Sequence, residues 1–133
     1  MLKHHEIDYL FEMAQAFAPH EMCGLLFDDG FHLTRNVAED PTHAFKIDHQ
    51  DYVMACMIHD GKPWAIVHSH PNRGAGASPK DCALMDALDV CRQDLAMVIV
   101  GLHPREIRCF RKRGDLYRCE WGHQAIGTGV PVG

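Results

Sequence analysis

Three stretches of the chain place apolar residues at helical spacing, recurring every three or four positions. The first covers residues 6–18. The second is expected to begin after Asp48 and the third after Ser78, because both side chains are good helix N-caps. Each is followed three positions later by an acid, Asp51 or Asp81. The pattern therefore predicts three helices that each turn an apolar stripe toward a core.

Short apolar runs between and after these stretches predict strands. The run at 95–102 is apolar almost without interruption, which is typical of a central strand covered on both faces. Asp28-Asp29-Gly30 and Gly114-Asp115 predict hairpin turns. The expected strands are residues 22–27, 31–37, 64–67 running on into His68, 95–102, 106–113 and 116–121. Strands interleaved with three helices predict an α/β fold with a mixed, curved sheet.

Length and charge narrow the class of protein. The 133 residues suit one domain with a modest core. A formal net charge of −5 is the opposite of a basic nucleic-acid footprint and gives no attraction to anionic membranes. No signal-peptide core begins the chain, and no apolar run approaches membrane-spanning length. We therefore expect a cytoplasmic protein with reduced cysteines and with neither nucleic acid nor membrane among its partners.

The candidate chemistry follows the run at 64–67 directly. Side chains alternate along a strand, so His68 and His70 point to the same side. Two imidazoles with the Asp81 carboxylate suit Zn²⁺, and a fourth coordination position left to water distinguishes a catalytic zinc site from a structural one. Asp81 can equally be only the capping acid of the helix that begins at Ser78. Since this helix start aims Asp81 back at the loop, capping and coordination can coexist.

Two separated motifs resemble a known family. His-x-His-Pro, six residues and then Ser-x-x-Asp, at positions 68–81, resembles the signature of the JAMM (MPN-plus) metalloproteases. Upstream, Glu21 stands before a Cys-Gly-Leu-Leu strand, as in the first motif of that family. The segments 36–41 and 45–48 look like its bacterial and phage-tail branch. The resemblance covers roughly residues 6–120 and implies one MPN/JAMM-type domain over 1–121. The Gly-rich end, 122–133, is expected to be a flexible tail.

The resemblance also implies roles for the residues. His68, His70 and Asp81 would bind one Zn²⁺ per chain. Glu21, which taken alone could be an ordinary solvated carboxylate, would be hydrogen-bonded to the water at the zinc and act as general base. Ser78 would donate a hydrogen bond to the developing oxyanion, besides its role as N-cap.

The function implied is that of a zinc metallopeptidase or isopeptidase. Its expected substrate is a ubiquitin-like or sulfur-carrier protein, cleaved after the C-terminal tail. Two alternatives stay open: a phage-tail assembly peptidase that acts on a structural protein, and a non-catalytic scaffold of the MPN type. A scaffold has no need of a complete ligand set, which argues against it. Assembly into a homo-oligomer also stays open.

Overall fold

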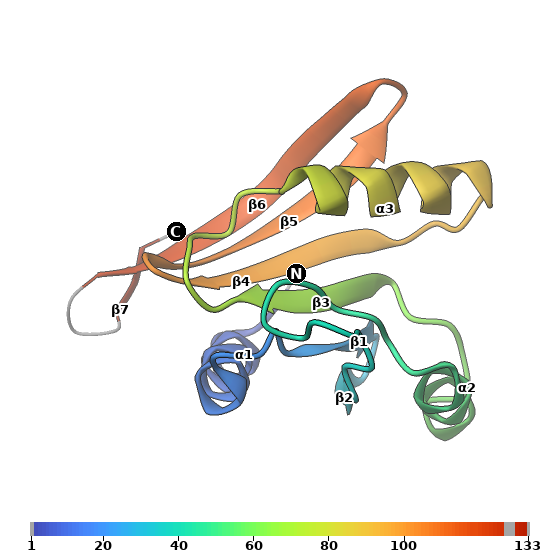
Figure 1. The fold of residues 1–133 in the computed structure, drawn as a ribbon, viewed down its shortest axis with the longest axis horizontal. Coiled ribbons are helices and arrows are strands. Elements are labelled where there is room, and N and C mark those ends of the chain that lie inside the picture. Colours follow the sequence, from blue (N-terminus) through green and yellow to red (C-terminus); the bar gives the residue numbers. More distant parts are fainter. Residues whose placement is uncertain (1, 127–129, 133) are drawn as a thin grey trace.

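The fold is built on one seven-stranded sheet, in the order β2-β1-β3-β4-β5-β6-β7 (Figure 1). The central pair β3–β4 is parallel, and the other neighbouring pairs are antiparallel. The computed structural model describes residues 2–126 and 130–132. The strands are β1 (Cys23–Phe27), β2 (Gly30–Thr34), β3 (Ala65–His70), β4 (Ala96–Leu102), β5 (Arg105–Arg113), β6 (Leu116–Ile126) and β7 (Val130–Val132).

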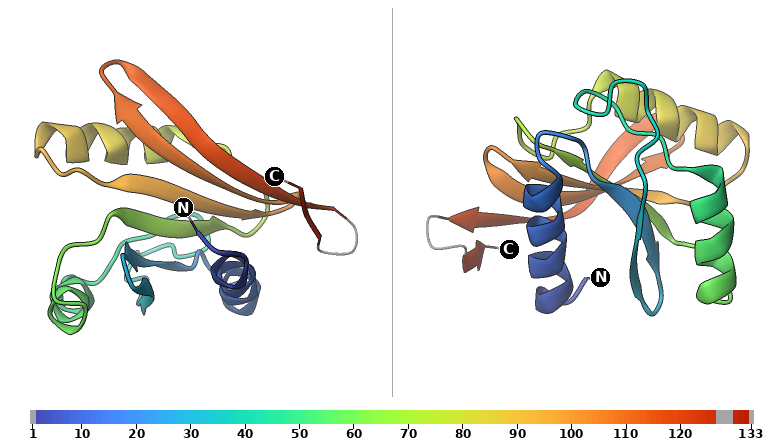
Figure 2. Two further views of the ribbon diagram at one scale, coloured as in Figure 1. Left: turned by 180° about the vertical axis from the view of Figure 1, so that it is seen from behind. Right: turned by 60° about the horizontal axis from the view of Figure 1, so that its bottom comes forward.

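Three helices cover the two faces of this sheet. α1 (His4–Phe17) packs on one face, while α2 (His49–Ile58) and α3 (Pro79–Val90) pack on the other. The sheet twists strongly between the β1–β2 hairpin and the β5–β6 hairpin (Figure 2). The predicted α/β class, with a mixed, curved sheet flanked by helices, is confirmed. In the described part of the chain, no helix has the length and apolar character needed to cross a membrane.

Strand alternation decides which helix each side chain meets. Val67 and Val98 are paired neighbours on β3 and β4 and belong to the core under α1. Ile66 and Met97 are the adjacent pair and face the other way, toward α2 and α3. His68 and His70 lie two and four positions after Ile66, so both imidazoles project into the layer that contains α3. β4 is buried along its whole length, as expected for a central strand.

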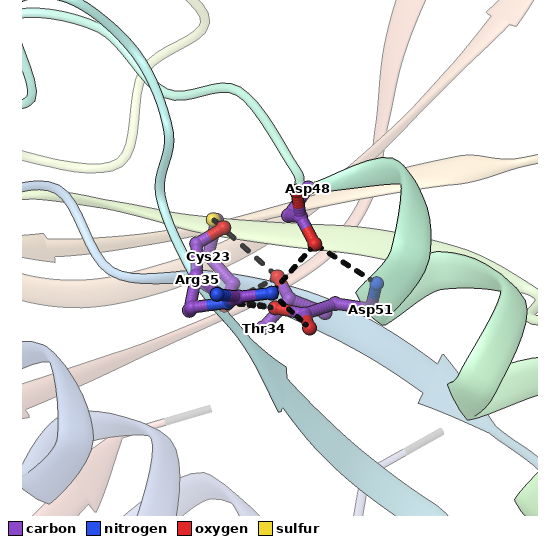
Figure 3. A network of polar contacts seen from close by, with 5 residues as sticks. All are labelled: Cys23, Thr34, Arg35, Asp48 and Asp51. Carbon is purple, nitrogen blue, oxygen red and sulfur yellow. Dashed lines mark hydrogen bonds and ion pairs between the residues drawn. The ribbon is translucent and has the colours of Figure 1, made fainter.

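A polar network joins the end of β2 to the first turn of α2 (Figure 3). Arg35 donates to the Asp48 carboxylate over 2.9 Å and to the Asp51 carboxylate over 3.2 Å. Asp48 is the N-cap of α2 and accepts the Asp51 N–H, as predicted. Beside this network the Cys23 thiol contacts the Thr34 hydroxyl at 3.5 Å. Burial raises the pKa of Cys23 to about 11, which suits a packing role for this thiol.

Two predicted strand ends are wrong. β2 stops at Thr34, not at residue 37, because the Arg35 amide donates to the Asp51 side chain instead of to a strand. The hairpin strand predicted to end at residue 121 continues to Ile126, since the backbone of residues 122–124 still pairs with β5 and β7 pairs with the end of β6. Residues 127–129 and 133 lie outside the described residues, and the flexibility of the tail stays a prediction.

The loop from β3 to α3 is held down on the ends of β4 and β5. Gly101 is the strand neighbour of His70, and a Cβ on it would lie 2.6 Å from the Ala75 amide nitrogen. That amide donates to the buried Glu106 carboxylate over 2.8 Å, and the Arg73 carbonyl accepts the Leu102 N–H over 3.1 Å. This close approach of backbone to backbone requires glycine at position 101.

Gly101→Ala is therefore expected to destabilise the protein by about 1–3 kcal/mol, because neither backbone can move away from the new methyl group without losing hydrogen bonds. The free energy of unfolding in urea measures this loss. Gly76→Ala is the matched control: it lies in the same loop, and a Cβ there meets nothing within 4 Å. Equal stabilities of the two variants would contradict the proposed packing of the loop on β4.

Candidate functional site

Three buried side chains converge at the end of β3. His68 and His70 extend from that strand, and Asp81 comes from the first turn of α3. The His68 Nε2 atom lies 2.9 Å from Asp81 Oδ1, and His70 Nε2 lies 3.2 Å from Asp81 Oδ2. The two Nε2 atoms are 3.2 Å apart. One potential ligand atom from each residue falls within 4.8 Å of the others, so this group could hold a metal ion.

The hydrogen bonding of His70 shows that the group suits a cation. Its Nδ1 lies 2.9 Å from the Gly74 carbonyl oxygen, which can only accept, so Nδ1 carries the proton. In a neutral His70 the Nε2 atom is then a bare lone pair. That lone pair faces a carboxylate oxygen and the second imidazole, an arrangement that a metal ion or an extra proton must stabilise. An acceptor that fixes the ring from its far side is also a common feature of histidine ligands.

Asp81 has the two roles that the sequence left open. Its Oδ2 accepts the Ser78 N–H over 2.9 Å, and its own N–H donates to Ser78 Oγ over 3.1 Å, which closes the capping box of α3. Burial by itself would raise the pKa of Asp81, but the close contacts of its carboxylate with the His68 and His70 rings outweigh burial and hold that pKa well below its usual range. The same carboxylate thus caps the helix and faces both imidazoles as an anion.

His68 is packed more tightly than its partners. Its side chain is fully buried, and the ring of Phe45 stacks on it with centroids 4.3 Å apart. Burial lowers its pKa, against the opposing effect of Asp81, so the neutral ring is favoured. Its Nδ1 atom is buried and has no hydrogen-bond partner among the described residues. A neutral imidazole is the form that coordinates a metal.

Glu21 lies two residues before β1, beside this group, with only 5% of its surface exposed. Burial is the main cause that raises its pKa to about 7, with a further increase from Asp81 and an opposing effect from His70. A carboxyl group with this pKa can both take up and release a proton near neutral pH. Glu21 does not belong to the three-residue group that could bind the metal.

The backbone at Glu21 is fixed on several sides. Its N–H donates to the Pro41 carbonyl over 2.7 Å, and Asn36 donates to the Glu21 carbonyl over 3.0 Å. The next residue, Met22, donates to the hydroxyl of Ser69 over 2.7 Å and accepts the Ser69 N–H. Ser69 lies between the two histidines in sequence but points to the opposite face of the sheet. Strand β3 therefore supplies two side chains to the candidate site and a third, Ser69, that fixes Met22, the residue after Glu21.

Asn36 and Phe45 are the functional positions that sequence reasoning missed. The Asn36 side chain makes four hydrogen bonds, to the backbone of Glu21, Ala38, Ala44 and Lys46. It thereby closes the loop that carries Phe45 over His68. In the sequence, segments 36–41 and 45–48 carry only a resemblance to the family, and no local pattern in them gives these two residues a role.

A cleft opens beside the three-residue group, in two arms. One arm, of about 170 Å³, is lined by Ser78, Asp81 and the apolar side chains of Phe45 and Leu84. The other, of about 230 Å³, passes His70 and the polar loop residues on the far side. Glu21 lines both arms. The structure thus brings Glu21, Ser78, His70 and Asp81 to the lining of this cleft, while His68 is fully buried and lines neither arm.

Comparison with known proteins agrees with the predicted family. A solution structure of a protein from Desulfitobacterium hafniense matches 89% of this chain and 87% of that one with a TM-score of 0.65, at 20% identity, which supports the fold. The tail tip assembly protein K of Escherichia phage N15 is 31% identical over 118 residues. That match covers 83% of this chain and 44% of the phage protein, so the chain spans less than half the length of this relative.

The family model of the prokaryotic homologues of the JAB domain matches residues 4–113, a region that contains Glu21, Ser78 and all three potential ligands. Since this match covers most of the sequence, the chain belongs to the prokaryotic JAB-domain family.

Proposed function

We propose that this protein is a zinc-dependent metallopeptidase that hydrolyses an amide bond after the C-terminal tail of a ubiquitin-like or sulfur-carrier protein. The observation that carries the proposal is the buried His68–His70–Asp81 group with Glu21 beside it in an open cleft. Two imidazoles and one carboxylate are ligands that suit zinc. The set is complete and its second histidine is oriented by Gly74, features that a non-catalytic scaffold does not require.

The chain's own residues divide the work of the reaction. When bound, zinc supplies Lewis acidity and lowers the pKa of a water molecule to about 7. Glu21 takes a proton on its carboxylate and delivers it to the leaving amine, as its raised pKa favours. The Ser78 hydroxyl accepts the Asp81 N–H through its oxygen, so its hydrogen remains available to a developing oxyanion. Phe45 and Leu84 supply apolar surface to one arm of the cleft.

The shape of the cleft supports an extended protein tail as the substrate. A groove with two arms that meet at Glu21 suits an extended tail that passes across it. The similarity to a tail tip assembly protein favours a second candidate, a peptidase that acts on a structural protein during phage-tail assembly.

Purified protein is expected to contain about one zinc per chain, lost on substituting His68, His70 or Asp81, because the two ligands that remain hold zinc poorly. Metal analysis after dialysis measures this. His103→Ala, which changes an exposed histidine, is the control and should keep its zinc. Stoichiometric zinc in a His68→Ala/His70→Ala double variant would contradict the proposed metal centre.

The metal-free protein should lose stability as the pH rises from about 4.5 to 7, by up to about 3 kcal/mol from Glu21 alone. The folded state holds the pKa of Glu21 above its usual value and so favours the protonated form; this contribution is complete below the ordinary pKa and vanishes above the raised one. Urea unfolding with a chelator at several pH values, for wild type and Glu21→Gln, isolates the effect.

The difference in free energy of unfolding between wild type and Glu21→Gln should fall across that pH range. Glu39→Gln, at an exposed position of the neighbouring loop, should show no such trend. The chelator is needed because a bound divalent cation would itself favour the ionised carboxylate. A pH-independent difference for Glu21→Gln would show that the carboxyl group is not buried as described.

The zinc-loaded protein should cleave a sulfur-carrier protein fused through its C-terminus to a reporter, at the fusion junction. Glu21→Gln should lower the rate steeply and keep the zinc, because it removes a proton carrier and no ligand. Ser78→Ala should lower the rate with a stability loss of about 1 kcal/mol from the missing cap. Gel analysis of the products and metal analysis of each variant measure these outcomes.

Wild-type rates in Glu21→Gln would place the general base elsewhere. Inertness toward several such fusions, with zinc bound, would instead favour the phage-tail candidate or the scaffold.

A further inference from the structure

We propose that the cleft binds a carboxylate next to the scissile amide, through Arg73 and Lys80. This inference rests on the proposed function, which places the scissile amide beside Glu21. The ligand class is an acidic peptide, either with an Asp or Glu side chain at that position or with a terminal carboxylate there.

Arg73 is placed at the junction of the cleft. Arg73 lines both arms. Its backbone is fixed, since the Arg73 carbonyl accepts from the amides of both Leu102 and His103. The guanidinium makes no hydrogen bond or ion pair with any residue in the described part of the chain. A guanidinium group on a fixed backbone, with its N–H donors free, is suited to bind a carboxylate.

Lys80 approaches the cleft from the opposite side, from the first turn of α3. Its Nζ donates to the carbonyl of His43 over 3.2 Å, so the side chain reaches across to the loop held by Asn36. Within residues 2–126 and 130–132 it has no acidic partner. The ammonium keeps two further protons to donate, which an incoming carboxylate can accept.

Several other cations among the described residues also lack an acidic partner, among them Lys62, Arg105 and Arg118, but none of these lines the cleft. Arg111, Lys112 and Arg113, on the β5–β6 hairpin, each pair with one or two acids. The chain as a whole carries more acids than cations, with a net charge of −5. Arg73 and Lys80 have no acidic partner among the described residues, and both line the same cleft. This arrangement favours the binding of an anionic ligand.

The electrostatics of the site add to this preference. Arg73 and Lys80 both lie close enough to Glu21 to lower its pKa, and Arg73 also lowers the pKa of His68. A carboxylate placed near either cation is therefore within electrostatic reach of the reacting region. The two charges would favour an acidic residue beside the scissile amide and disfavour a basic one.

Three peptides test the proposal. Two have the sequence acetyl-Ala-Ala-Gly-Gly-X-Ala-amide, with Asp or Asn at X; the third is shortened by its last residue and ends at Asn with a free C-terminal carboxylate, acetyl-Ala-Ala-Gly-Gly-Asn. Binding is followed by amide NMR shifts of zinc-loaded Glu21→Gln protein, which avoids turnover. The variants Arg73→Gln and Lys80→Gln are made singly and together in this background, with Arg118→Gln and Lys62→Gln as matched controls at exposed positions outside the cleft.

The Asp peptide or the free-acid peptide should bind roughly five- to tenfold more tightly than the neutral Asn peptide, as expected for two partly exposed charge pairs. Tighter binding of the Asp peptide would identify a side-chain carboxylate as the ligand, and tighter binding of the free-acid peptide would identify a terminal carboxylate. The preference should weaken with salt, fall in each single variant and disappear in the double variant, while both controls keep it.

Equal binding of all three peptides, or no binding at millimolar concentration, would overturn the inference. So would a preference that survives in the double variant, because the zinc alone would then attract the carboxylate. Binding is measured without turnover, so the outcome is separable from that of the proposed function. A carboxylate preference in a protein that cleaves no fusion would contradict the proposed substrate and keep the carboxylate site. Cleavage of the fusion without such a preference would keep the proposed function and overturn the carboxylate site.

Discussion

The Asp81 carboxylate is the group on which the candidate site depends. It closes the capping box of α3 with Ser78 and at the same time faces both imidazoles. A buried carboxylate is costly unless every oxygen has a partner, and here the helix start and the histidines supply those partners together. The direction of α3, the position of Ser78 and the spacing of the ligands are therefore set by one residue. Moving the helix start would change all three at once.

The backbone around Glu21 is held by hydrogen bonds from residues that have no direct part in the proposed chemistry. Asn36 satisfies all four hydrogen-bonding positions of its amide against the loop and Glu21. Ser69 fixes Met22 from β3. Glu21 is thereby held at a definite place relative to strand β3. Proximity and orientation of a proton carrier contribute strongly to rate. Under the proposed function, Asn36 and Ser69 therefore contribute to the rate by positioning Glu21.

Much of this could be predicted from the sequence, for identifiable reasons. The period of two in β3 placed His68 and His70 on one face, and Ser-Pro-x-Asp predicted both a helix start and a third potential metal ligand. The strand ends were less predictable, because Arg35 leaves the sheet to pair with two acids that lie over ten positions away in sequence. The residues after 121 offered little to bury, yet their backbone continues to pair, which composition does not reveal. The roles of Asn36 and Phe45 depend on a loop conformation that no local pattern encodes.

The placement of Ser69 on the face opposite the histidines has a consequence for strand pairing. A slip of β3 by one residue would turn Ser69 toward the layer that contains α3, and both imidazoles would then face the apolar layer under α1. Such a misaligned strand would lose its fixation of Met22 and its three-residue group together, and would bury two polar rings among Leu, Val and Ile. The alternating pattern His-Ser-His thus acts as a register mark for the strand: the residues that serve the site are also those that make every neighbouring alignment unfavourable.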